Sequence, residues 1–118
     1  MDKMKIYSLV TRLLERSKTN NVEWEKTNKE SVYQVSLPNY SLRISELIIV
    51  KKSPLDSRQV EYELSIFNEA GEMIDKFTDE DLSEIDYNSH AVFKDLFSLA
   101  RRSSFGVEGA IDEIMGYL

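Results

Sequence analysis

The chain has 118 residues, of which 31% are charged and 42% hydrophobic, with a formal net charge of −6 and no cysteine. We expect one domain that folds without a metal or a disulfide, and the absence of cysteine excludes thiolate chemistry. The acidic balance disfavours nucleic-acid binding. The longest apolar run, residues 47–50, is too short for a signal peptide or a membrane span, so we expect a cytoplasmic protein with no membrane partner.

The first predicted element is an amphipathic helix. Apolar residues recur at helical spacing from Ile6 to Leu14, and charged residues fall mostly off that stripe. Asp2 and Lys18 carry the charges that favour the two ends of a helix dipole. The Asn20-Asn21 pair predicts the end of the helix, because asparagine tolerates the left-handed conformation that follows a last helical turn.

Strands are predicted next. Alternating apolar and polar residues mark five of them, at 22–27, 33–37, 42–49, 60–67 and 72–77. Turns are predicted at Pro38-Asn39 and at 68–71, where Gly71 suits a positive φ. Strands joined by short turns favour an antiparallel meander with one apolar face and one water-facing face.

The third strand has an irregular pattern. Apolar residues occupy even positions at Leu42 and Ile44 but odd positions at Leu47 and Ile49. This change of parity predicts a β-bulge near Ser45-Glu46. Alternatively, the distal half of the strand is buried on both faces.

Two amphipathic helices are predicted after the strands. The first runs from Asn88 or Ser89 to Arg102, and the second lies within residues 107–118. We expect these helices and the N-terminal helix to cover one face of the five-stranded sheet, as a single two-layer α+β domain over residues 1–118. The second helix has a complete apolar stripe, which could instead pair with a second copy across a two-fold axis. The stripe consists of Val107, Ala110, Ile111, Ile114, Met115 and Leu118.

The C-terminal helical region also carries a motif. Residues 100–112 read Ala-Arg-Arg-x-x-x-Gly-Val-x-x-Ala-Ile-Asp, which resembles the tail of a family of small uncharacterised bacterial α+β proteins. Trp24 in the first strand and the hairpin at 68–71 fit the order of elements in that family, so the resemblance covers residues 22–118. The resemblance implies the α+β fold, and it implies no activity and no site residue.

Charge is unevenly distributed along the chain. Residues 1–52 contain 10 Lys/Arg and 6 Asp/Glu, whereas residues 53–118 contain 5 and 15. This pattern is typical of two solvated faces, but it also favours a protein partner with a basic surface. The expected contact residues are on the open sheet face and in the connector that follows it: Glu61, Glu63, Phe67, Asp79 and Asp81. Trp24 is expected either in the core or, with Phe67 and Ile74, in a small apolar spot on that face.

The best sequence candidates for a small-anion site are Arg101, Arg102 and Gly106. A helix N-terminus offers free backbone N–H groups to an anion, and here two arginines precede it. The alternative is that Gly106 allows two helices to pack closely.

Catalytic residue types are scarce. His90 is the only histidine, and the carboxylates in 79–86 lack the spacing of a calcium loop, so we expect no catalytic residue, metal ligand or cofactor. The main hypothesis is a non-catalytic protein-binding module, such as a small adaptor, inhibitor, or immunity or antitoxin type of protein, present as a monomer or homodimer. The alternatives are a small-ligand or divalent-metal-dependent enzyme that uses the 79–86 connector with His90, and a self-associating structural protein.

Overall fold

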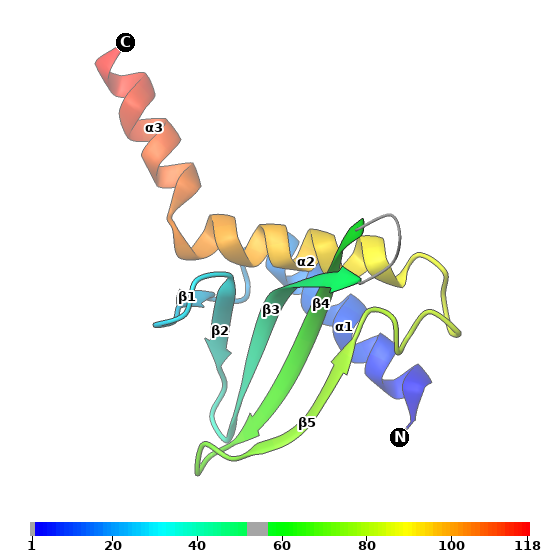
Figure 1. The fold of residues 1–118 in the computed structure, drawn as a ribbon. Helices are drawn as coiled ribbons and strands as arrows, with labels where there is room; N and C mark the ends of the chain where they lie inside the picture. The colour runs from blue at the N-terminus through cyan, green and yellow to red at the C-terminus, as the bar shows by residue number, and fades with distance from the viewer. Residues whose placement is uncertain (1, 52–56) are drawn as a thin grey trace.

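The computed structural model describes residues 2–51 and 57–118 (Figure 1). Within these residues the strands form one antiparallel sheet in the order β1-β2-β3-β4-β5, which confirms the predicted meander. In chain order the elements are α1 (Lys3–Lys18), β1 (Glu25–Lys26), β2 (Val32–Ser36), β3 (Tyr40–Lys51), β4 (Ser57–Asn68), β5 (Met73–Thr78), α2 (Ser89–Ser104) and α3 (Val107–Tyr117). The α+β class is therefore confirmed.

The ends of α1 follow from the residues there. Asp2 is the N-cap, and its Oδ1 accepts a hydrogen bond of 3.1 Å from the backbone N–H of Lys5. Asn20 adopts a left-handed φ of 58° after the last turn, as predicted. Trp24 then donates its indole N–H to Ser17 Oγ at 3.0 Å and is only 3% exposed. Trp24 is therefore a core residue, and its alternative place on the open face is wrong.

Strand β3 is continuous through the region where its pattern changes. Its register with β4 runs without a shift from the Tyr40–Asn68 pair to the Lys51–Ser57 pair, so the predicted bulge in β3 is wrong. Ile48 is 61% exposed, so the distal half is not buried on both faces either. The parity changes because a polar residue takes a helix-side position: Glu46 lies opposite Tyr62, which hydrogen-bonds to it at 3.3 Å. The observed register shift lies between β4 and β5, at Ile66/Phe67.

The core lies between the sheet and the two helices α1 and α2. Helix α2 contacts α1 and strands β1 to β4, so it links the helical layer to most of the sheet. Tyr33 and Tyr62 belong to this core, as predicted, and both rings pack against Phe97. The most deeply buried side chains include Val10, Ile44, Leu64, Phe77, Leu82, Phe93 and Leu96.

Helix α3 is placed differently from the other helices. The prediction put it over the sheet, but in the described chain it contacts α2 alone, and none of its residues is buried (Figure 1). The chain turns at Gly106, whose φ of 63° is left-handed, and α3 then extends away from the body. A Cβ atom built on Gly106 would meet nothing within 4 Å, so this glycine serves the turn and not a close helix contact. No helix in the described ranges is long and apolar enough to span a membrane.

Candidate functional site

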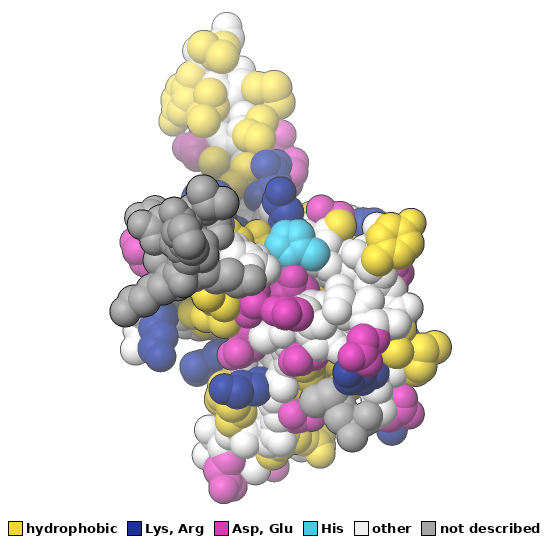
Figure 2. All heavy atoms as spheres, turned by 45° about the vertical axis from the view of Figure 1, so that its right-hand side comes forward, with side chains coloured by type: hydrophobic (Ala, Val, Ile, Leu, Met, Phe, Trp, Pro, Cys, Tyr) yellow, Lys and Arg dark blue, Asp and Glu magenta, His cyan; other side chains and the backbone are white. Residues whose placement is uncertain are grey.

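Within the described residues, α3 carries a group of exposed apolar side chains. Figure 2 shows hydrophobic side chains gathered on this helix above the body. Ile111, Ile114 and Met115 are 42%, 57% and 60% exposed. Their spacing is that of an apolar helix face, which in most proteins is buried against another element. Burial of one such side chain stabilises a complex by about 1.5–3 kcal/mol, so this stripe is a strong candidate contact surface.

The remaining side of α3 is acidic. Glu108, Asp112 and Glu113 are its charged residues, and the helix contains no lysine or arginine. Glu108 pairs with Arg102 at 3.3 Å, and Glu113 accepts a hydrogen bond of 3.4 Å from the Tyr117 hydroxyl. The apolar stripe is therefore bordered by negative charge.

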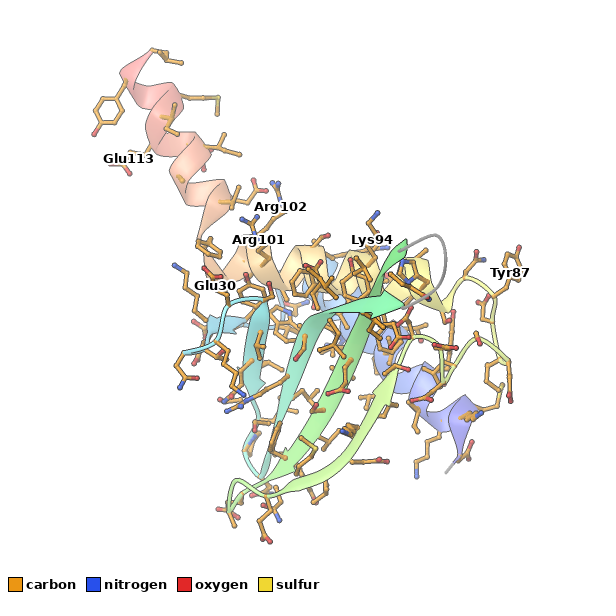
Figure 3. All side chains as sticks on the ribbon, in the orientation of Figure 1. Glu30, Tyr87, Lys94, Arg101, Arg102 and Glu113 are labelled. Atoms are coloured by element: carbon orange, nitrogen blue, oxygen red, sulfur yellow. The ribbon has the colours of Figure 1, made fainter. Side chains whose placement is uncertain are left out.

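A basic hollow lies at the C-terminal end of α2, close to the start of α3. It has a volume of about 340 Å³, and its charged lining residues are Lys26, Lys29, Glu30 and Arg101. Figure 3 shows Glu30 and Arg101 near each other at this end of α2. The Phe105 ring also lines the hollow: the Nζ of Lys26 lies 3.8 Å from the ring centroid and the Cζ of Arg101 lies 5.2 Å from it.

The predicted anion site is divided by the fold. Arg101 faces the basic hollow, whereas Arg102 and Gly106 line a separate hollow of about 280 Å³ beside the first turn of α3. Arg102 is paired with Glu108 there, which offsets its charge. Sequence reasoning missed Lys26 and Lys29, because nothing in a single sequence indicates that the loop after β1 meets the end of α2.

The predicted open-face residues lie on the sheet surface that faces away from α1 and α2. Glu61 and Glu63 are half-buried there, and Phe67 is also half-buried, with the Arg43 guanidinium 4.8 Å from its ring centroid. Met73, the register partner of Phe67 on β5, is 50% exposed. Glu61, Glu63 and Phe67 therefore lie on one face, but part of the Phe67 ring is in contact with Arg43.

Asp79 is buried and hydrogen-bonded to other elements of the fold. Its side chain is 7% exposed, its Oδ1 accepts a hydrogen bond of 2.9 Å from the backbone N–H of Tyr62, and its Oδ2 lies 2.5 Å from Nδ1 of His90. The Ser89 hydroxyl donates to the Asp79 carbonyl oxygen at 2.7 Å. These contacts join the start of α2 to β4, so Asp79 does not belong to the exposed binding surface that the sequence suggested.

Asp79 and His90, which the enzyme hypothesis combines, do meet. The His90 side chain is 52% exposed and its ring lies against Tyr62, with the centroids 5.5 Å apart. Burial raises the pKa of the Tyr62 hydroxyl, and the neighbouring Glu46 carboxylate adds to this shift. A carboxylate on Nδ1 orients an imidazole for proton transfer or metal binding. However, none of the hollows described above is lined by His90.

The other connector acids are also used locally. Asp81 accepts a hydrogen bond of 2.8 Å from the Thr78 backbone N–H, and the Thr78 hydroxyl accepts one of 3.2 Å from the Asp81 N–H. Tyr7 on α1 donates its hydroxyl to Asp86 at 2.7 Å. Across the described ranges, histidine and carboxylate side chains form no group of three placed to hold a metal ion.

Comparisons with known proteins identify no relative of the chain. No protein-family model matches the chain, and neither a curated protein nor a solved structure matches it. The resemblance at residues 100–112 stays a prediction, and function is inferred from the geometry.

Proposed function

We propose that the chain is a protein-binding module that docks through the apolar stripe of α3. The observation that supports this is the contrast between pattern and burial: α3 has a full apolar stripe, yet none of its residues, all of which the structure describes, is buried. Exposed apolar patches of this kind mark interaction surfaces, and an amphipathic helix inserted into a groove is a common mode of protein recognition.

The acidic residues on α3 indicate the charge expected on the partner's surface. The stripe is bordered by Glu108, Asp112 and Glu113, so a groove with apolar walls and a lysine- or arginine-rich rim is the complementary surface. This chemistry agrees with the basic partner that the acidic second half of the sequence favours. The open-face residues Glu61, Glu63 and Phe67, together with Asp81, stay predicted contributors on a separate surface.

The test compares capture by matched variants. The tagged full chain, with and without crosslinker, is used to capture partners, and each candidate is then purified and its affinity measured. We expect the double variant Ile111→Ser with Ile114→Ser to bind at least about tenfold more weakly, because two central apolar anchors are lost. A partner that binds this variant as tightly as the wild type contradicts the proposal.

The control variant leaves the stripe intact on the same helix. Gly109 and Gly116 lie off the apolar stripe, and a Cβ atom at either position would meet nothing within 4 Å. Gly109→Ala with Gly116→Ala raises helix propensity and removes no contact, so it should bind at least as tightly as the wild type. Light scattering of the purified chain shows whether the partner is a second copy.

A further inference from the structure

The basic hollow at the end of α2 is a second candidate surface, with more positive than negative charge. Lys26, Lys29 and Arg101 bring three positive charges to it, and Glu30 brings one negative charge. Within the described residues, none of the three cations forms an ion pair with a carboxylate. A local net charge of this sign is notable because the whole chain carries −6.

The loop that forms one wall of the hollow is held in a fixed conformation. Thr27 Oγ1 accepts a hydrogen bond of 3.2 Å from the backbone N–H of Lys29 and lies 2.9 Å from the Val32 carbonyl oxygen. Ser31 has a φ of 60°, which is uncommon for a residue with a side chain, and its carbonyl accepts a hydrogen bond of 3.0 Å from the Glu46 N–H. These contacts hold the loop in place as one wall of the hollow.

The opposite wall supplies an apolar contact. Phe105 is 49% exposed, and its ring makes a T-shaped contact with the buried ring of Tyr33, with the centroids 6.3 Å apart. Lys26 and Arg101 both lie within 5.2 Å of the Phe105 centroid, so positive charge and aromatic surface are adjacent. At about 340 Å³, the hollow is within the size range of small-molecule sites.

We infer that this hollow binds a small phosphate monoester. The dianionic phosphate group matches the excess of two positive charges, and guanidinium and ammonium groups are its usual partners in proteins. The organic part of the ligand lies against the exposed surface of Phe105. The site involves no residue of α3, so it is independent of the proposed docking function.

The experiment is an NMR titration of the ¹⁵N-labelled full chain at physiological salt. The probes are phenyl phosphate, inorganic phosphate and phenol. A peptide of sequence 107–118 is the acidic peptide competitor. Lys26→Gln and Arg101→Gln test the site. Lys94→Gln is the matched control, because Lys94 is exposed on the same helix and lies outside the hollow (Figure 3). Amide dispersion shows that each variant is folded.

The expected result is a saturable shift with phenyl phosphate, confined to residues 26–33 and 101–105. Either test variant should weaken binding by about tenfold, because a charge-assisted contact is lost, and Lys94→Gln should bind as the wild type does. Phenol should give no saturable shift, and inorganic phosphate should bind the same residues more weakly. The inference is overturned if phenyl phosphate does not saturate, if the test variants bind it normally, if inorganic phosphate binds equally well, or if the peptide binds the hollow more tightly.

Discussion

At the scale of single residues, the acidic connector shows how similar side chains acquire different roles. Asp79, Asp81 and Asp86 lie close together in the sequence, where each looks like a solvated carboxylate. In the structure Asp79 is buried against Tyr62 and His90, Asp81 closes a turn with Thr78, and Asp86 receives the Tyr7 hydroxyl. Sequence spacing shows the turn, but it cannot show the two contacts with distant elements.

Removal of the Asp79 carboxylate should destabilise the fold. Asp79→Ala leaves the buried Tyr62 N–H without its acceptor, which costs about 1–3 kcal/mol of unfolding free energy. Asp81→Ala removes an exposed turn contact and should cost less than about 1 kcal/mol. Urea unfolding at neutral pH measures both variants. Equal losses would show that Asp79 has no special structural role.

The Tyr7–Asp86 contact should make stability depend on pH. The hydrogen bond with Tyr7, followed by the Asn88 N–H, lowers the pKa of Asp86 below its ordinary 3.8. The same hydrogen bond, with burial and the Asp86 charge, raises the pKa of Tyr7 to about 12. Stability from Asp86 is present above 3.8 and is lost as pH falls through its lowered pKa. Stability from Tyr7 is present below 10.0 and is lost as pH rises through about 12.

Tyr7→Phe tests this dependence. The variant should unfold at lower urea than the wild type at pH 7, and the difference should shrink as the pH falls through the lowered pKa of Asp86. Tyr87→Phe is the control, because Tyr87 is 88% exposed and should unfold as the wild type does across the same pH range. A Tyr7→Phe deficit that stays constant while Asp86 becomes protonated would exclude a contribution from the Asp86 charge.

At the scale of elements, periodicity predicts where helices and strands form but not what covers them. The stripes of α2 and α3 are equally regular in the sequence, yet Leu96 on α2 is fully buried and Ile114 on α3 is 57% exposed. Similarly, Ile48 alternates as a core residue of β3 but is exposed. The chain turns into α3 at Gly106, whose left-handed φ gives no indication in the sequence of what the next helix packs against.

The two helices should therefore respond differently to the same kind of substitution. Leu96→Ala in α2 removes a buried side chain and should cost about 2–5 kcal/mol of unfolding free energy. Ile114→Ala in α3 should change it by no more than about 0.5 kcal/mol, because no contact with the body is lost. Chemical denaturation measures both variants. A large cost for Ile114→Ala would show that α3 packs against the body.

At the scale of the whole molecule, the fold class could be predicted because each element carries its own pattern and short turns restrict the topology. The sites could not, because they join residues from distant parts of the chain: Lys26 with Arg101, and Asp79 with Tyr62. The predicted anion-site residues Arg101 and Arg102 line two separate hollows. The helix predicted to cover the sheet, α3, is exposed.

The central claim is that α3 is a docking helix without a partner inside its own chain. Amide hydrogen exchange of the purified chain at low concentration tests it most directly, because exchange protection reports local stability. We expect strong protection in α1, α2 and β2 to β4 and rapid exchange throughout residues 107–117. Protection of α3 as strong as that of α2 in the dilute monomer would contradict the claim.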